Sequence, residues 1–354
     1  MKRALGVVLA VLVLAAAAGA GFWWWRDRRI TEFARTPAGA AGTKDVLVPA
    51  ASSPRRVADL LAQAGVVSDA DLTYAWLRRE KLGPKLRAGE YEFTLPLSPE
   101  QAIQKLVRGQ QKTYHVTIPE GLRVDEILPL LASSPLKLRL DRLQALAAYP
   151  SFVRKLGVPA DRLEGFLFPD TYSFTHGYTE ESVLAKMVSR ALEETQAAVA
   201  SKDPAVKLEP LQLVTLASIV EKETGAPDER PRIACLFLNR LRLGMPLQTD
   251  PTVLYAMMLM RGRFVKNLTR QDLLTPHPYN TYTVHGLPPG PIASPGTASL
   301  QAVAHPSTCR DLYFVSRNDG THVFCPTLQC HNAAVKKWQV DYWAEQPRRA
   351  RSGH

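Results

Sequence analysis

The chain has no zinc-finger, RRM-like or helix-turn-helix signature, although its formal net charge of +11 suits an anionic partner. This lack argues against nucleic acid. It leaves anionic lipid, an acidic polymer or a merely solvated basic surface to explain the charge. The basic residues are spread along the chain and cluster only near its ends, at Arg26 to Arg29 and at Arg348 to Arg351. We therefore expect no nucleic-acid partner.

Cysteine is scarce, with four residues in 354. Cys235 lies inside the apolar segment IACLFLNRL, which predicts a buried thiol. Cys309, Cys325 and Cys330 are close in sequence, and two of them could pair in an oxidising compartment, although the spacing does not say which two. The alternative is a zinc site formed by Cys325, Cys330 and His331, but that spacing fits no common zinc motif. We expect no metal and no cofactor.

Charge is missing from the whole stretch ALGVVLAVLVLAAAAGAGFWWW, which runs from Ala4 to Trp25. A helix of this length reaches about 33 Å at about 1.5 Å per residue, and a bilayer core is about 30 Å thick. The three tryptophans at 23–25 would lie in the interfacial aromatic belt, with the arginines that follow just outside it. The pattern therefore predicts a transmembrane anchor.

A cleaved signal peptide is the alternative, because AGA at Ala18 to Ala20 resembles a cleavage site. The apolar run continues past this site through the tryptophans, which favours the anchor. We expect residues 1–25 to be a cytoplasmic tip and a single span in the inner, or plasma, membrane. The bulk of the chain would then lie on the periplasmic or extracytoplasmic side.

A sequence pattern occurs twice after residues 26–44, which are rich in alanine, glycine and threonine and predict a flexible linker. VLVPAASSPRRVADLLAQAG starts at Val46, and VTIPEGLRVDEILPLLASS starts at Val116. Each copy reads as a short strand ending in proline, a turn, and the start of an amphipathic helix. We expect a small α/β module over 45–115 and a connecting strand-helix segment over 116–163.

Between the two copies, a strand and a capped helix are predicted. Tyr91, Phe93 and Leu95 alternate along one strand face. Ser98 is then a helix N-cap, with a proline at the first helical position and a glutamine three residues after the cap, and Gly109 closes the helix. These elements complete the predicted module.

The third part of the chain, residues 164–345, predicts a larger mixed α+β domain. Helices are expected at 182–200, 211–224 and 232–243, and the middle one is almost wholly apolar, hence central. Beyond Pro246 the chain is rich in proline and glycine, as expected of loops that grip a ligand. A hairpin is predicted in DLYFVSRNDGTHVF, and residues 346–354 are expected to be disordered.

Two glutamates end the apolar helix in ASIVEKETGAP, which spans 217–227. Because a helix turns about 100° per residue, Glu221 and Glu223 point about 200° apart and cannot serve the same cleft. Glu223 stacks on Leu216, Ile219 and Val220, where desolvation raises the pKa of a carboxyl group. The helix is expected to end at Gly225 as its left-handed cap, so the negative end of its dipole raises the same pKa.

A carboxylic acid kept protonated near neutral pH is what a general acid requires. The helix geometry therefore selects Glu223. The alternative is that both glutamates are ordinary helix-end residues held by Lys222, Arg230 or Arg232.

A resemblance bears on this choice. The segments ASIVEKET, LFLNRLRLGMPLQTDPTVLYAM, YNTYTVHGLPPGPIASPG and HNAAVKKW together resemble the endolytic murein transglycosylases, the membrane-bound lytic transglycosylases of the YceG-like group. EGFLFPDTYSF and RAGEYEF are also similar to signatures of that family. The resemblance covers nearly the whole chain. The sequence departs from the family pattern at Ser294, where asparagine or threonine often stands, and in its extra cysteines.

The resemblance implies an N-terminal transmembrane helix, a LysM-like α/β module and an α+β catalytic domain. It implies cleavage of peptidoglycan between N-acetylmuramic acid and N-acetylglucosamine within the strand, leaving 1,6-anhydro ends. It also implies that the glutamate before threonine, Glu223, is catalytic. Partnership with peptidoglycan synthases is implied as well, so that cutting nascent strands would terminate their elongation.

Sugar-binding candidates are the amide, hydroxyl, carboxyl and aromatic side chains of two loop segments: Gln248, Thr249, Asp250, Tyr279, Asn280 and Tyr282. Weaker candidates are Asp170, which also suits a turn, and His331 with Asn332. Two other functions stay open. One is a catalytically inactive peptidoglycan-binding anchor, and the other is a muramidase, a hydrolase that pairs Glu223 with Asp250.

Overall fold

The computed structural model describes residues 2–342 and 344, with side chains described from residue 6 onward. The chain divides into two compact units. The first comprises the chain up to Tyr114 together with Ser173–Gly177, and the second comprises His115–Tyr172 together with the chain from Tyr178 onward. The disordered tail predicted for 346–354 lies outside the described residues.

The first unit contains α1 (Lys2–Arg35), β1 (Ala38–Val48), α2 (Pro54–Gln63), α3 (Ala70–Arg79), β2 (Gly89–Leu97) and α4 (Pro99–Arg108). Two strands, β3 (Thr113–Thr117) and β4 (Thr171–Thr175), pair in a sheet of their own, and the division between the units falls within them. The second unit contains α5 (Val124–Ala132), α6 (Leu140–Ala147), α7 (Pro150–Lys155), α8 (Glu180–Ser201), α9 (Pro210–Glu223), α10 (Arg230–Arg242), α11 (Asp250–Arg261), α12 (Arg270–Leu274), α13 (Thr297–Ala304), β5 (Tyr313–Ser316), β6 (His322–Cys325) and α14 (Leu328–Val335). The protein is thus mixed α+β.

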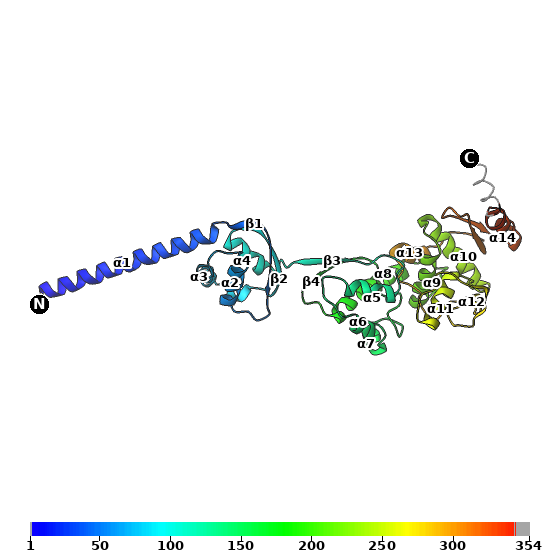
Figure 1. Ribbon diagram of the computed structural model, residues 1–354, viewed down its shortest axis with the longest axis horizontal. Helices are drawn as coiled ribbons and strands as arrows, with labels where there is room; N and C mark the ends of the chain where they lie inside the picture. The colour runs from blue at the N-terminus through cyan, green and yellow to red at the C-terminus, as the bar shows by residue number, and fades with distance from the viewer. Residues whose placement is uncertain (1, 343, 345–354) are drawn as a thin grey trace, which may run out of the picture. The chain divides into compact units, whose positions relative to one another are not determined.

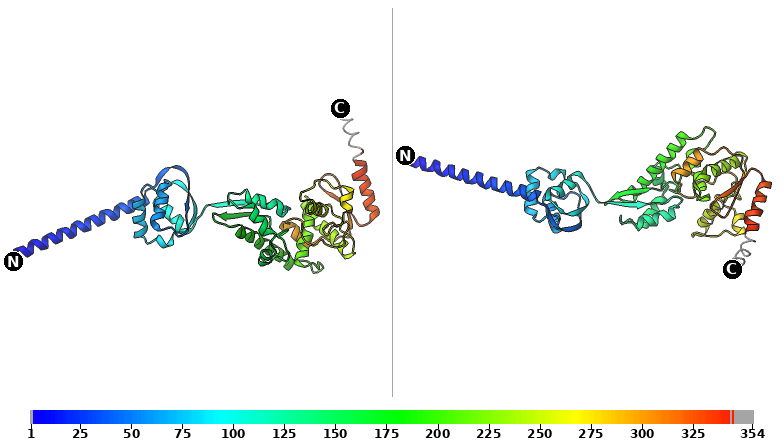
Figure 2. Two further views of the ribbon diagram at one scale, coloured as in Figure 1. Left: turned by 60° about the horizontal axis from the view of Figure 1, so that its bottom comes forward. Right: turned by 90° about the horizontal axis from the view of Figure 1, so that it is seen from above.

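Helix α1 is one uninterrupted helix, drawn in dark blue in both views of Figure 2. Within the described residues it is the one helix long and apolar enough to cross a membrane, and the apolar window is unburied. The flexible linker predicted for 26–44 is wrong. Ile30 and Ala34 are buried in the core of the first unit, which extends the helix to Arg35, and β1 begins only three residues later.

The module that follows contains an antiparallel pair of strands, with two helices between them in the sequence and a third helix after the second strand. β1 pairs with β2, with Val46 opposite Tyr91 and Lys44 opposite Phe93. The predicted alternation is confirmed, since Tyr91, Phe93 and Leu95 are all buried. The predicted caps of α4 are also confirmed. Ser98 forms a capping box with Gln101, and Gly109 ends the helix at a φ of 69°, where a side chain would be strained.

The two copies of the sequence pattern form the same local structure. In the first copy β1 leads through a turn into α2, and in the second β3 leads through a turn into α5. The predicted strand-turn-helix repeat is therefore confirmed.

The core of the second unit is formed by helices around α9. Helices α8, α10, α11 and α13 all contact α9 (Figure 1). Eight consecutive residues of α9, Leu213 to Val220, are buried, which explains why the sequence shows an apolar run without helical periodicity. The central position predicted for this helix is confirmed, and its end points to the site described below.

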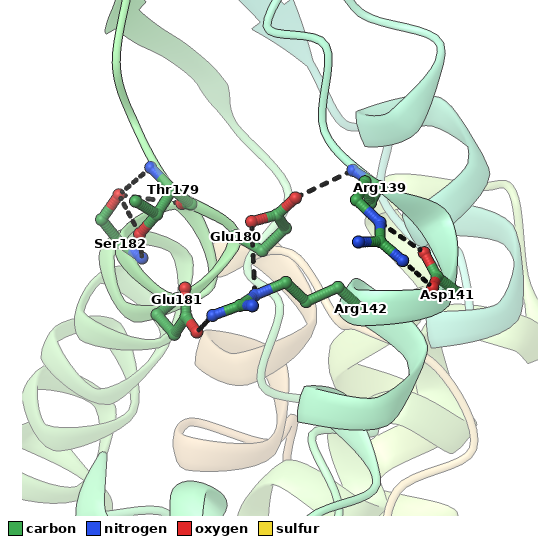
Figure 3. A network of polar contacts seen from close by, with 7 residues as sticks. All are labelled: Arg139, Asp141, Arg142, Thr179, Glu180, Glu181 and Ser182. Carbon is green, nitrogen blue, oxygen red and sulfur yellow. Dashed lines mark hydrogen bonds and ion pairs between the residues drawn. The ribbon is translucent and has the colours of Figure 1, made fainter.

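Polar contacts join the start of α6 to the start of α8 (Figure 3). Thr179 caps α8, and Glu180 accepts a hydrogen bond of 2.9 Å from the backbone N–H of Arg139. Arg142 reaches both Glu180 and Glu181. Exposed ion pairs contribute little stability, so this network serves mainly to set the relative position of the two helix ends.

Two disulfides hold the C-terminal part. The predicted hairpin is confirmed as β5 and β6, with Tyr313 opposite Cys325. Cys325 pairs with Cys330, which consumes the thiolates that the zinc alternative required. The buried free thiol predicted at Cys235 is wrong, because Cys235 pairs with Cys309, 74 residues away. Only the packing of the segment before β5 against α10 brings these two sulfur atoms together.

Candidate active site

The end of α9 presents the two glutamates to different surroundings. Helix α9 ends at Glu223, and the next residue, Thr224, is extended. The left-handed cap predicted at Gly225 is therefore wrong, since Thr224 ends the helix by leaving helical geometry. As the helix geometry predicts, the two carboxylates find separate partners.

Glu221 is a structural residue. Its side chain is 5% exposed and pairs with Arg230 at 3.2 Å. It also accepts a hydrogen bond of 3.1 Å from the backbone N–H of Gly296. One turn earlier, Ser218 accepts a hydrogen bond from the N–H of Ile292 at 3.0 Å. These two contacts fasten the proline-rich loop to α9, so this glutamate is committed to holding the fold.

Glu223 instead faces the start of α11. The hydroxyl of Thr249 donates a hydrogen bond to its carboxylate. Thr249 itself is held by Thr281, whose hydroxyl accepts from the Thr249 N–H at 3.1 Å and lies 2.8 Å from the hydroxyl of Thr252. Sequence reasoning missed Thr281 because a buried threonine carries no signal of its own. Thr281 holds Thr249 in place, and Thr249 in turn holds the carboxylate of Glu223.

The pKa of Glu223 is raised to about 7, chiefly by burial and further by the negative charge of Asp250. The hydrogen bond from Thr249 and the positive charge of Arg240 act in the opposite direction. The residue keeps part of its surface exposed. It can therefore be reached by a ligand while holding a proton near neutral pH, as the sequence predicts.

Arg240 is a second residue that sequence reasoning missed. It is 7% exposed and donates hydrogen bonds to the backbone oxygens of Leu312 at 2.7 Å and Leu247 at 2.7 Å. Its guanidinium lies over the ring of Tyr313, 5.3 Å from the centroid. Arg240 thus ties α10 to the segment leading to Thr249 and to the C-terminal hairpin, and its fixed charge acts on Glu223.

Three of the sugar-binding candidates lie at the exposed rim of this site. Gln248 and Asp250 flank Thr249 in sequence and are both exposed. The hydroxyl of Tyr282 donates to Asp250 at 2.7 Å. Gln248 has a φ of 53°, a conformation rare outside glycine, and its N–H donates a hydrogen bond of 3.1 Å to the backbone carbonyl oxygen of Thr281. The charge of Asp250 acts on Glu223, and Tyr282 is hydrogen-bonded to Asp250, so the structure brings these two side chains close to Glu223.

Asn280 was predicted to bind sugar, and the structure contradicts this. Its side chain is fully buried, and its amide donates to the backbone oxygens of Asp272, Leu273 and Thr275. The N–H groups of this amide are used in hydrogen bonds that close the loop after α12, so the side chain has no donor left for a ligand. Tyr279 is half-buried and packs on the ring of Tyr255 at 4.8 Å between centroids.

A second glutamate with a raised pKa lies elsewhere in the unit. Burial raises the pKa of Glu164 to about 7. Both of its oxygens are occupied, one by the N–H of Val124 at 3.2 Å and the other by the hydroxyl of Tyr255 at 3.2 Å. It borders a cavity of about 200 Å³ lined mainly by apolar side chains. Glu164 therefore has both carboxylate oxygens held by the protein, at the start of α5 and at Tyr255, whereas the hydrogen bonds of the described residues hold one oxygen of Glu223, through Thr249.

Of the weaker candidates, Asp170 and His331 have partners within the fold. Asp170 accepts from the Thr171 N–H at 2.7 Å and from Arg190 at 3.3 Å, as suits a turn. His331 stacks on Tyr313 at 5.2 Å, and Asn332 is exposed on α14. Ser294, where the sequence departs from the family pattern, is buried, and its backbone pairs with Gly121 and Leu122.

Comparison with known proteins gives consistent results. The model of the YceG-like family matches residues 46–337. An endolytic murein transglycosylase from Bacillus subtilis is 32% identical over 316 residues, which is 84% of this chain and 85% of the relative. One from Streptococcus pneumoniae D39 is 30% identical over 76% of this chain, which spans about half (53%) of that longer relative.

A solved structure also matches. The crystal structure of a YceG-like protein from Listeria monocytogenes has a TM-score of 0.55 and 29% sequence identity, and the match covers 83% of this chain and 99% of the other.

Proposed function

The chain belongs to the YceG-like family, and from that premise we propose that it is an endolytic murein transglycosylase with Glu223 as its acid and base. It cleaves the bond between N-acetylmuramic acid and N-acetylglucosamine within peptidoglycan strands. The observation that carries the proposal is a partly exposed carboxyl group with a pKa of about 7, held by Thr249 at the end of a buried helix.

One carboxyl group suffices for this reaction. Protonated Glu223 donates its proton to the glycosidic oxygen, and the N-acetylglucosamine leaves. The C6 hydroxyl of the muramic residue attacks its own C1, and the Glu223 carboxylate takes the hydroxyl proton. A 1,6-anhydro end forms and the enzyme returns to its starting state. Because the nucleophile belongs to the substrate, its effective concentration is high and no second carboxylate has to position water.

The surrounding residues support this chemistry. Tyr282, which is hydrogen-bonded to Asp250 and lies close to Glu223, offers an aromatic face for a pyranose ring, and Gln248 offers an exposed amide next to Thr249 in the chain. Tyr279 packs on Tyr255, the partner of Glu164. The carboxylate of Asp250 accepts a hydrogen bond of 2.7 Å from the hydroxyl of Tyr282, and its negative charge helps to keep Glu223 protonated. We assign Asp250 this electrostatic role rather than that of a hydrolytic base.

The proposal is tested by the chemistry of the products. Purified peptidoglycan digested by the full chain in detergent, in water enriched in heavy oxygen, is expected to yield anhydro-muramic ends without the heavy isotope. Labelled reducing ends would instead establish the muramidase alternative. Asp250→Asn separates the two mechanisms further, since a two-carboxylate hydrolase should lose about as much activity as on loss of Glu223.

A pH profile tests the role of Thr249. Because the general acid must carry its proton, activity is expected to fall as the pH rises above about 7. The hydrogen bond from Thr249 lowers the pKa of Glu223, so Thr249→Val should move this fall to higher pH. It should also reduce kcat about ten- to hundredfold through looser positioning. Thr283→Val, in an exposed threonine of the neighbouring loop, should change neither, and an unmoved profile in Thr249→Val would refute the role.

The rest of the chain suits action near a membrane. We propose that α1 is a single-pass anchor with the two units on its extracytoplasmic side. The disulfides agree with an oxidising compartment. The β1–α2–α3–β2 arrangement is suited to a LysM-like, glycan-binding role. Folded protein that retains peptidoglycan but yields no products would favour the alternative function, an inactive peptidoglycan-binding anchor. Partnership with synthases, with termination of nascent strands as its result, is part of this proposal.

A further inference from the structure

A charged groove lies between α1 and α3 in the first unit. Its volume is about 440 Å³. On α1 it is lined at i, i+3, i+4 and i+7, and on α3 at i, i+1, i+4 and i+5, so one face of each helix forms each wall. The lining residues are Trp23, Arg26, Asp27 and Ile30 on α1, and Tyr74, Ala75, Arg78 and Arg79 on α3.

The two walls are fixed to each other. Arg79 donates to the carboxylate of Asp27 at 3.0 Å and to the hydroxyl of Thr31 at 2.8 Å. One turn further along α1, Ile30 and Ala34 are 4% and 1% exposed in the core of the unit. The groove is therefore a built part of the fold, not a chance gap beside a loosely attached helix.

The groove carries an excess of positive charge. Three arginines line it against a single aspartate, which leaves a net charge of +2. Arg79 already neutralises Asp27. Arg26 and Arg78 are exposed, and the described residues offer neither of them an ion pair within 4 Å. The guanidinium of Arg78 lies 6.0 Å from the ring centroid of Tyr74. Two guanidinium groups are thus available to an anion.

The position of the groove relative to the membrane interface indicates which kind of anion it binds. This step relies on the proposed role of α1 as a membrane anchor. The uncharged run ends at Trp25, and Trp23, 71% exposed, lies where aromatic side chains meet the lipid interface. Arg26 is the first charge beyond that run, one turn past Trp23, so the groove opens at the level of the lipid headgroups.

We propose that this groove binds the phosphate of an anionic phospholipid headgroup, with Arg26 and Arg78 as its ligands and Trp23 beside the upper part of the acyl chains. Arginine suits this role because its planar fork forms paired hydrogen bonds to phosphate oxygens. A bound lipid bridges the anchor and α3, and so fixes the orientation of the module on the bilayer surface.

The test measures lipid retained by the full-length chain in native mass spectrometry, from detergent holding equal amounts of phosphatidylglycerol and phosphatidylcholine. Wild type is expected to retain about ten times more phosphatidylglycerol. Arg26→Gln with Arg78→Gln should bring the ratio close to one. The matched control is Arg87→Gln with Arg108→Gln, which removes the same charge from exposed positions on the same module outside the groove, and it should keep the wild-type ratio.

Three outcomes overturn the proposal. In the first, the groove variant keeps the preference for phosphatidylglycerol. In the second, the control variant loses that preference equally, which would mean general charge attraction. In the third, excess inorganic phosphate abolishes the preference, which would mean a site for a free anion. Flotation with phosphatidylglycerol vesicles separates this proposal from the anchor. If all variants float but the ratios do not differ, the groove proposal fails alone, whereas a wild type that does not float removes the anchor and the groove together.

Discussion

Glu223→Gln is expected to lower the formation of anhydro-muramic ends by about 10²- to 10⁴-fold, the largest effect of any single substitution in this chain. The amide has nearly the same shape and can still accept the hydrogen bond from Thr249. It can neither donate a proton to the glycosidic oxygen nor take one from the C6 hydroxyl. The measurement is product formation from purified peptidoglycan, by mass spectrometry, with thermal unfolding to show that the variant is folded.

Glu164→Gln is the matched control, because it makes the same chemical change at a partly buried carboxyl group whose pKa is also about 7. Glu164 has both oxygens occupied by α5 and Tyr255, so its loss should leave activity within about tenfold of wild type. Equal losses in the two variants would show that the assay follows folding and not proton transfer. Full activity in Glu223→Gln would remove the proposed mechanism.

Removal of the disulfide between Cys235 and Cys309 is expected to destabilise the chain by about 4 kcal/mol. The bond closes a loop of 74 residues, and the chain entropy released in the unfolded state grows with loop length. Cys325 and Cys330 are only 5 residues apart, for which the same relation gives about 2 kcal/mol. Denaturant unfolding of the double serine variants, Cys235→Ser with Cys309→Ser and Cys325→Ser with Cys330→Ser, measures both.

The long-range disulfide should also matter for activity. It joins α10, which carries Arg240, to the segment leading into the C-terminal hairpin, and Arg240 donates to the backbone oxygens of Leu247, just before Thr249, and of Leu312, just before the hairpin. Treatment of wild type with a reductant should therefore lower both stability and activity, and the serine variant should no longer respond at that bond. Equal stability of the two serine variants would contradict the loop-length argument.

Much of this protein follows from its sequence because the relevant signals are local. An uncharged run long enough to span a bilayer, Ser98 and Gly109 as helix ends, and the alternation of Tyr91, Phe93 and Leu95 each depend on a few neighbouring residues. The separation of Glu221 from Glu223 is likewise local, since the turn per residue of a helix places them on different sides. These features were predicted correctly without knowledge of any distant contact.

Other features depend on residues far apart in the chain, and no local pattern contains them. Residues 26–35 look polar and loose, yet they are helical because Ile30 and Ala34 pack into a core made by later segments. Asn280 has the chemistry of a sugar ligand, but the loop around it uses its amide. Cys235 meets Cys309, Thr281 holds Thr249, and Arg240 acts on Glu223, because packing of the second unit brings together positions that are not neighbours in the chain. Burial and long-range pairing are properties of the assembled core, so the residue types at a site can be read from the chain, whereas which of them remain free to bind follows from the packing.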